Sequence, residues 1–240
     1  MRNETISYRD GDADLRGQLY FDETKTGKRP GILVMPPGSG LGEHSKERAQ
    51  RLAKLGYVAL AGDPFGGGAV AGNYEEAEKF AALFRDDALR FRQRVRVSLD
   101  ALAARPEVDS TRMGAIGFCM GGTFVLELAR SGAPVKGVVT FHGLLEAKRP
   151  AQAGEIKAKV LVCNGAEDPL VPQTAIDGFT AEMTAAQVDW QIINYAGAKH
   201  SFTNPLAGNY GRPDLAYHEH ADTHSWTAMT RFFADLFSVR

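Results

Sequence analysis

Short apolar runs alternate with amphipathic segments from about residue 30 to the end of the chain. The runs are rich in β-branched residues and have the length of strands, whereas the segments between them repeat apolar residues every three or four positions, as helices do. Parallel strands need a crossover between them, and a helix is the usual crossover. The pattern therefore predicts an α/β protein in which a mainly parallel sheet has helices on both faces.

The individual elements follow from these repeats. The predicted strands cover residues 31–35, 57–63, 112–118, 135–142, 159–165 and 188–195. The predicted helices cover residues 46–55, 75–84, 86–104, 120–130, 174–184 and 214–237. Before them, two segments of alternating apolar and polar residues flank the turn at Asp10-Gly11-Asp12 and predict an antiparallel hairpin at the sheet edge. The complete sheet would then have about eight strands.

The composition is that of an ordinary globular protein, with 240 residues, 44% hydrophobic residues, 24% charged residues and a formal net charge of -1. A chain of this length can bury one sizeable core, so residues 1–240 are predicted to form a single domain. The small net charge argues against nucleic acid as a partner. The N-terminal segment lacks a signal-peptide core, and no apolar run approaches the roughly 20 residues that span a bilayer. We therefore expect no membrane partner and a cytoplasmic location.

Two cysteines are present, and neither lies in a spacing typical of a disulfide framework or a metal site. Cys119 occupies the centre of Gly117-Phe118-Cys119-Met120-Gly121, between a predicted strand and a predicted helix. This is the G-x-nucleophile-x-G form of a nucleophile elbow, in which glycines make room for a sharp turn and the helix N-terminus favours a thiolate. The alternative interpretation is a small cysteine buried beside glycines that allow close packing. Cys163, in the middle of a predicted strand, is expected to be a buried structural thiol.

An acid and a histidine follow the elbow along the chain. Asp168 comes just after the predicted strand 159–165, and His200 comes just after the predicted strand 188–195. The order nucleophile, acid and histidine, each past the carboxyl end of a strand, is the order of an α/β-hydrolase triad. In such a triad the acid orients the imidazole, and the imidazole moves the proton of the nucleophile.

Together these motifs resemble those of the dienelactone hydrolase family of α/β-hydrolases. The matching segments are 117–122, 165–169 and 200–202, supported by 56–60, Asp63, 141–143 and 225–226. The resemblance implies the α/β-hydrolase fold, with Cys119 as nucleophile, His200 as base and then acid, and Asp168 as the group that orients the imidazole. It also implies an oxyanion hole formed by the backbone N–H groups of Gly38 and Met120. It implies no metal and no organic cofactor.

Two departures from the family's pattern bear on the chemistry. The family usually has a glutamate in the loop after the strand 31–35, where it can hold or help deprotonate the thiol, whereas this chain has Pro37 there. Glu43 is near in sequence but is expected to open the next helix. The family's arginine after the His-Ser-Phe triplet helps bind the substrate carboxylate, whereas this chain continues as Thr203-Asn204-Pro205. The second departure weakens the case for dienelactone itself as the substrate.

Further residues are candidates to bind or shape the substrate, and each has a plainer alternative. Arg85, or else Arg90, could supply positive charge, but an arginine on an amphipathic helix usually faces solvent. His142 ends a predicted strand and could face the pocket, although a hydrogen-bonded structural histidine is the better expectation. Phe65 and Phe202 could line an apolar pocket or fill the core.

The segment 218–224 contains His218, His220 and His224. The last two are four positions apart, so on a helix they would share one face, as the ligands of a transition metal can. Solvated clusters of this kind are common on helices, and no third ligand is evident. No metal site is therefore predicted.

The predicted function is hydrolysis of a small carboxylic ester or lactone through the triad Cys119, His200 and Asp168 and a covalent acyl-enzyme. The same scaffold could act on a thioester or another activated acyl bond. A non-catalytic binding protein derived from a hydrolase is the alternative from a different class, although no member of the triad is missing. The pattern specifies neither the natural substrate nor an oligomeric state.

Overall fold

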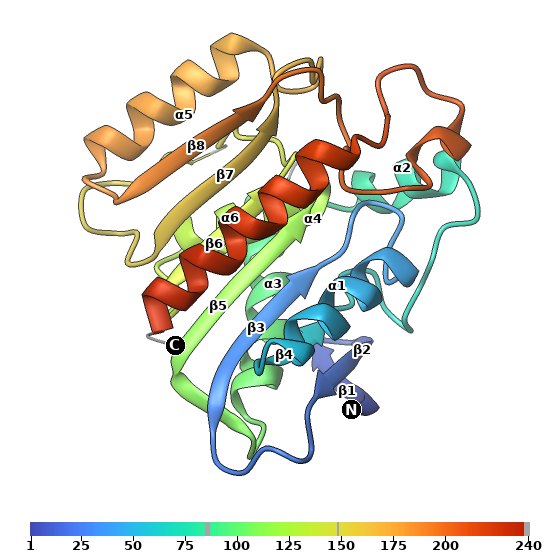
Figure 1. Cartoon of the computed structure of the whole chain (residues 1–240), viewed down its shortest axis with the longest axis vertical. Coiled ribbons are helices and arrows are strands. Elements are labelled where there is room, and N and C mark those ends of the chain that lie inside the picture. Colours follow the sequence, from blue (N-terminus) through green and yellow to red (C-terminus); the bar gives the residue numbers. More distant parts are fainter. Residues whose placement is uncertain (85–86, 148, 238–240) are drawn as a thin grey trace.

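An eight-stranded sheet runs through the molecule in the order β1-β2-β4-β3-β5-β6-β7-β8 (Figure 1). The computed structural model describes residues 1–84, 87–147 and 149–237. The strands are β1 (Arg2–Asp10), β2 (Ala13–Phe21), β3 (Arg29–Met35), β4 (Val58–Ala61), β5 (Val108–Phe118), β6 (Gly137–Phe141), β7 (Lys159–Gly165) and β8 (Trp190–Tyr195). The pairs that involve β2 are antiparallel, and the pairs from β4 to β8 are parallel. The predicted mainly parallel sheet is confirmed.

The N-terminal hairpin forms one edge of the sheet, as its alternating pattern predicts. β1 and β2 pair in unbroken register from Arg2 opposite Phe21 to Asp10 opposite Ala13. Gly11 has a positive φ of 58° in the turn between them, a conformation that glycine adopts without strain. β2 also pairs with β4, and this pairing joins the hairpin to the parallel strands.

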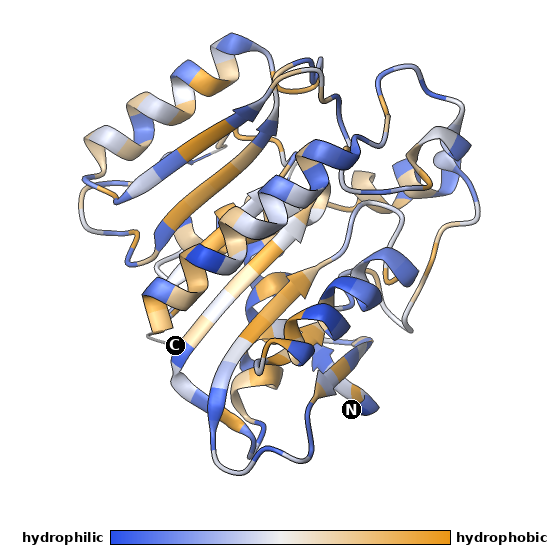
Figure 2. Cartoon of the chain, viewed as in Figure 1, coloured by the Kyte–Doolittle hydropathy of each residue, from blue (hydrophilic) through white to orange (hydrophobic). Residues whose placement is uncertain are grey.

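Helices cover both faces of the sheet (Figure 1). They are α1 (Glu43–Lys54), α2 (Tyr74–Ala82), α3 (Ala88–Ala103), α4 (Met120–Arg130), α5 (Gln173–Ala185) and α6 (Glu219–Phe237), with a short 3-10 helix η1 (Ala207–Tyr210). Two buried apolar clusters result. One holds Leu52 of α1 and Phe233 of α6, and the other holds Leu99 of α3, Phe124 of α4 and Phe179 of α5. In Figure 2, β3 and β7 inside the molecule are largely hydrophobic, whereas α1 on its surface carries many hydrophilic residues.

The carboxyl ends of the parallel strands meet at one edge of the sheet, and this edge positions the candidate site. Gly38 follows β3, Cys119 follows β5, Asp168 follows β7 and His200 follows β8. In an open α/β sheet, ligands bind at this edge. α2 and the loop that contains η1 lie near the same end of the molecule (Figure 1).

The last helix is shorter than the sequence pattern predicts. The pattern places its start at residue 214, whereas α6 begins at Glu219. His218 holds the chain at that point, because its backbone N–H donates to the carbonyl oxygen of Phe202 at 3.0 Å and its Nδ1 accepts from the backbone N–H of Ala221 at 3.2 Å. The ring thus satisfies a donor in the first turn of the helix. Within the described ranges, no helix is long and apolar enough to cross a lipid bilayer.

Candidate active site

Cys119 lies at the sharp turn between β5 and α4. Its backbone has φ 53° and ψ -120°, a conformation that is rare for a residue with a side chain. A Cβ at Gly117 would overlap the carbonyl oxygen of Gly121, and a Cβ at Gly121 would overlap the carbonyl oxygen of Met35. The requirement for glycine on both sides of Cys119, predicted from the sequence, is therefore confirmed.

Asp168 and His200 are joined by a hydrogen bond. Nδ1 of His200 lies 2.8 Å from Oδ2 of Asp168, and both side chains are buried. The other carboxylate oxygen of Asp168 accepts the backbone N–H of Leu170 at 2.8 Å. Because both oxygens are engaged, the carboxylate is fixed and the ring of His200 is oriented. Nε2 of His200 has no hydrogen bond of normal geometry within the described residues, and the ring lines the cavity that Cys119 also lines.

The charges at the site favour a thiolate beside an imidazolium. Burial raises the pKa of the Cys119 thiol. The charge on His200 and the backbone N–H groups of Met120 and Gly38 together lower it by more, so the pKa lies below its usual value. Burial lowers the pKa of His200, but the charge on Cys119 and the hydrogen bond to Asp168 outweigh it and raise the pKa to about 10. Each partner thus stabilises the charge of the other.

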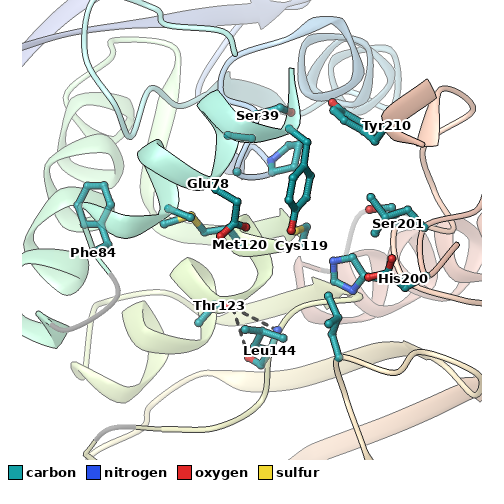
Figure 3. Close-up of a pocket in the computed structure, with 18 of the residues that line it drawn as sticks. Ser39, Glu78, Phe84, Cys119, Met120, Thr123, Leu144, His200, Ser201 and Tyr210 are labelled. Atoms are coloured by element: carbon teal, nitrogen blue, oxygen red, sulfur yellow. Dashed lines mark hydrogen bonds between the residues drawn. The ribbon is translucent and has the colours of Figure 1, made fainter. Parts of the chain in front are cut away.

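A cavity of about 470 Å³ opens above Cys119 (Figure 3). Four of the residues predicted for catalysis line it, namely Gly38, Cys119, Met120 and His200, while Asp168 lies behind His200. Two backbone N–H groups and an imidazole therefore converge on one sulfur atom at the bottom of a cavity. This arrangement can activate a nucleophile, hold an oxyanion and move a proton.

The structure does not bring the predicted substrate-binding residues to this cavity. Phe65 stacks on Phe80 with ring centroids 4.7 Å apart and packs against the core. Phe202 is fully buried, and its ring centroid lies 5.1 Å from that of His142. Both rings pack against apolar or aromatic neighbours instead of the cavity. Arg85 lies outside the described residues.

His142 is a buried structural histidine, which is the plainer of the two expectations for it. Its Nδ1 accepts the backbone N–H of Cys119 at 3.0 Å, and this N–H also lies 3.0 Å from the carbonyl oxygen of Phe141. Its Nε2 lies 2.8 Å from Oγ1 of Thr203. Burial and the charge on His200 hold the pKa of His142 well below its usual value. The ring is therefore neutral, accepts at Nδ1 and donates from Nε2.

Thr203 joins this histidine to a second buried group. Its carbonyl oxygen accepts from Nη2 of Arg48 at 2.7 Å and lies 3.1 Å from Nε2 of His44. Arg48 in turn pairs with Asp222 of α6 at 2.9 Å. The segment that follows His200 is thereby tied to both α1 and α6.

The sequence departures have clear positions in the structure. Pro37 lines the cavity where the family usually has a glutamate, and Glu43 is the first residue of α1, as expected. Asn204 lines the cavity after the His-Ser-Phe triplet. The charge on His200 has the largest effect among those that lower the pKa of Cys119, and it does not require an acid at position 37.

Sequence reasoning missed His44, Thr203 and the wall that α2 contributes. Tyr74, Ala77 and Ala81 line the cavity from one face of α2, where residues three or four apart lie together. Small residues in that spacing, on a helix near the carboxyl edge of the sheet, are the sequence feature that could have predicted this cavity wall. His44 and Thr203 are 159 residues apart in the chain, so no local spacing could pair them.

Two histidines of the segment before and within α6 lie close together. His220 and His224 lie on one face of the helix, with ring centroids 4.0 Å apart. Among the described residues, no group of three or more histidine, cysteine, aspartate or glutamate side chains is arranged to hold a metal ion.

The fold and the elbow define the class of the protein. An eight-stranded, mostly parallel sheet, a nucleophile at a strand-to-helix turn, and an acid and a histidine past later strands are the features of an α/β-hydrolase. The family model described as the dienelactone hydrolase family matches residues 15–237. The chain belongs to the dienelactone hydrolase family and is a hydrolase.

Three relatives illustrate the similarity. The chain is 44% identical to a dienelactone hydrolase-like promiscuous phosphotriesterase from metagenomic libraries, with 98% of each chain covered and a TM-score of 0.93. It is 46% identical to a solved structure designated m3DLH, again with 98% of each chain covered and a TM-score of 0.94. A probable 2-oxo-3-(5-oxofuran-2-ylidene)propanoate lactonase from Bradyrhizobium sp is 31% identical over 80% of this chain and 80% of its own length.

Proposed function

We propose that this protein hydrolyses carboxylic esters or lactones through a triad of Cys119, His200 and Asp168. The observation that carries the proposal is the meeting of Cys119, His200 and two backbone N–H groups in one cavity, with Asp168 bonded to the far side of the imidazole. The Bradyrhizobium relative is named a lactonase, which supports the same bond class.

The first half of the reaction forms an acyl-enzyme. The thiolate of Cys119 attacks the carbonyl carbon, and the electron pair of the carbonyl bond moves to its oxygen. The N–H groups of Gly38 and Met120 donate to this oxyanion. When the intermediate collapses, the bond from carbon to the leaving oxygen breaks, and Nε2 of His200 donates its proton to that oxygen. A thioester on Cys119 and a free alcohol result. A lactone gives the same thioester, with the alcohol still attached to the acyl group.

The second half releases the acid. Neutral His200 takes a proton from water, and the resulting hydroxide attacks the thioester carbon. The same two N–H groups stabilise the oxyanion, and its collapse breaks the bond from carbon to sulfur. Cys119 leaves as a thiolate beside a protonated His200, which restores the starting pair. Asp168 remains ionised throughout and holds the imidazole in position.

Hydrolysis assays with a panel of aryl esters, lactones and thioesters test this proposal. We expect turnover of at least one ester or lactone by the wild type and its loss in Cys119→Ala. Cys163→Ala is the matched control, because Cys163 is buried in β7 away from the cavity. Equal turnover by the wild type and Cys119→Ala would contradict the proposal. If the protein hydrolyses only thioesters, its substrates are thioesters and not esters or lactones.

Phosphotriester hydrolysis is a second candidate, because the solved relative at 44% identity is named a promiscuous phosphotriesterase. A thiolate that attacks a carbonyl carbon can also attack the phosphorus of an uncharged triester, and the same N–H donors would bind the phosphoryl oxygen. Release of 4-nitrophenol from diethyl 4-nitrophenyl phosphate, compared between the wild type and Cys119→Ala, tests this activity. Equal rates of 4-nitrophenol release by the wild type and Cys119→Ala would reject phosphotriester hydrolysis at Cys119.

A further inference from the structure

The two ends of the cavity differ in chemistry. At one end the lining is mainly apolar, with Ala77, Ala81, Phe84, Phe91 and Met120, and Glu78 is the polar side chain that Figure 3 shows between Phe84 and Cys119. At the other end it includes Ser201, Asn204, Tyr210 and Asp214. Figure 3 shows Phe84 on the opposite side of Cys119 from His200, with Met120 between them, while Ser201 and Tyr210 lie on the side of His200. An apolar arm and a polar arm therefore meet at the nucleophile.

The chemistry of the reaction assigns each arm to one part of the substrate. The oxygen that leaves must reach Nε2 of His200 to receive its proton, so the alcohol portion lies on the side of His200. The carbonyl oxygen points to the N–H groups of Gly38 and Met120, and Cys119 occupies the attacking direction. The acyl chain takes the direction that remains, away from His200.

We propose that the apolar arm is an acyl-binding site and that the substrate is an ester of a bulky, uncharged, apolar carboxylic acid with a small or polar alcohol. This assignment rests on the proposed hydrolase activity and names the substrate class of the same site. A cavity of about 470 Å³ lies within the range of drug-sized ligands. The whole cavity is larger than an acetyl ester needs.

The space in this arm comes from small side chains on a helix. Ala77 and Ala81 are four residues apart on α2 and therefore share one face, which is the face toward the cavity. The end of the arm is closed by Phe84 and Phe91, whose rings meet edge to face at 5.6 Å. Both rings are almost fully buried. An acyl chain in this arm would contact carbon atoms on several sides.

The charged side chains that line this arm, among the described residues, are carboxylates, which disfavours an anionic acyl chain. Behind the lining, the guanidinium carbons of Arg90 and Arg94 lie 5.3 and 5.5 Å from the centroid of the Phe84 ring, and Arg94 is paired with Asp10. Glu127 is buried and is neutralised by Arg92 at 2.7 Å and Arg130 at 3.0 Å. Glu78 lines the cavity from α2, and its carboxylate interacts with the hydroxyl of Tyr74. A carboxylate at the end of the acyl chain would lie near these acids, so an uncharged chain is the better match.

Two isomeric esters test the assignment directly. Phenyl hexanoate carries its extra carbons on the acyl side, and 4-butylphenyl acetate carries the same number of carbons on the alcohol side. We expect kcat/KM to be about tenfold or more higher for phenyl hexanoate, because only its chain reaches the apolar arm. A higher value for 4-butylphenyl acetate would overturn the assignment while leaving the hydrolase activity in place.

A variant that fills the arm provides the second test. Ala81→Phe should lower kcat/KM for phenyl hexanoate by about tenfold and change that for phenyl acetate by less than about twofold. Ala82→Phe is the matched control, because Ala82 is the next residue of α2 and is exposed. Equal losses on both esters, or no loss on either, would contradict an acyl site at this arm.

The outcomes separate this inference from the proposed function. Phenyl acetate turnover that is the same in the wild type and Cys119→Ala would reject both. If turnover depends on Cys119 but mono-phenyl adipate, which ends in a carboxylate, is preferred to phenyl hexanoate, the uncharged substrate class is wrong. Loss of that preference in Arg85→Gln would then assign the acyl end to Arg85.

Discussion

The backbone N–H of Cys119 lies 3.0 Å from Nδ1 of His142, a residue that does not line the cavity. The opposite nitrogen of the same ring lies 2.8 Å from Oγ1 of Thr203, three residues after His200. One buried, neutral imidazole therefore connects the turn that carries Cys119 to the segment that carries His200. Because Cys119 has a positive φ, this contact supports a backbone conformation that would otherwise relax.

Replacement of His142 should lower turnover more than substrate binding. His142→Ala removes one of the two acceptors of the Cys119 N–H and leaves the carbonyl oxygen of Phe141, and the loss of one buried hydrogen bond corresponds to roughly a tenfold fall in kcat. KM should change little, because the ring lies outside the cavity. His142→Asn keeps an acceptor near the position of Nδ1 and should recover part of the activity. Steady-state kinetics, with thermal unfolding to confirm folding, give the comparison, and equal kcat in all three proteins would reject the role.

The pH dependence of alkylation at Cys119 should reveal the ion pair. The pKa of Cys119 lies below its usual value, so the thiolate persists to lower pH than in a free thiol and is lost as the pH falls through that lowered pKa. The pKa of His200 is raised to about 10, so its proton is retained until the pH rises to that region. We expect Cys119 to react with iodoacetamide faster at pH 7 than a free thiol does, with a fall in rate on the acid side. An alkylation rate that rises only near the pKa of a free thiol would contradict the pair.

The sequence predicts the fold well because each layer leaves a local signal. β7 (Lys159–Gly165) and α4 (Met120–Arg130) have the predicted bounds, since β7 runs from a lysine to a glycine, and α4 begins at the elbow and ends at an arginine shortly before Gly132. The start of α6 could not be predicted, because it depends on hydrogen bonds from His218 to Phe202 and Ala221 and not on apolar spacing.

The candidate site is predicted only as far as its motifs reach. Cys119, Asp168 and His200 each follow a strand, so their meeting follows from the topology of the sheet. His142 and Phe202 occupy equally suggestive positions next to motif residues, yet both are buried and neither lines the cavity. Whether each ring faces the cavity or the core depends on the local backbone conformation. The spacing of residues in the sequence does not predict that orientation. The apolar arm is built by α2 and α3, which contain no catalytic motif.

Asp168→Asn should leave the fold intact and reduce kcat by roughly a thousandfold or more. The amide would favour the wrong tautomer of His200 and would no longer stabilise the imidazolium that the reaction needs. Glu167→Gln is the matched control, because Glu167 is the preceding residue and is exposed. Ester hydrolysis by the two variants gives the comparison. A loss of less than about tenfold in Asp168→Asn would show that another group orients the ring.

Arg130 should be important for stability. It is buried and pairs with Glu127 at 3.0 Å and Glu182 at 2.7 Å, so Arg130→Met would remove a guanidinium from two largely buried carboxylates, of which Glu127 keeps its pair with Arg92. The expected loss in the free energy of unfolding is about 3–5 kcal/mol. Arg96→Met, which breaks only an exposed pair with Asp100, should cost less than about 1 kcal/mol. Denaturant unfolding measures both, and similar losses would contradict the expected difference.

The central claim is that Cys119 carries a covalent acyl group during turnover. Rapid mixing of the protein with phenyl hexanoate, acid quenching and peptide mass spectrometry test it most directly. We predict a hexanoyl group on the peptide that contains Cys119, none on the peptide that contains Cys163, and disappearance of the adduct as substrate is consumed. Turnover in wild type with no adduct on Cys119 at any time, together with turnover that survives Cys119→Ala, would contradict the account.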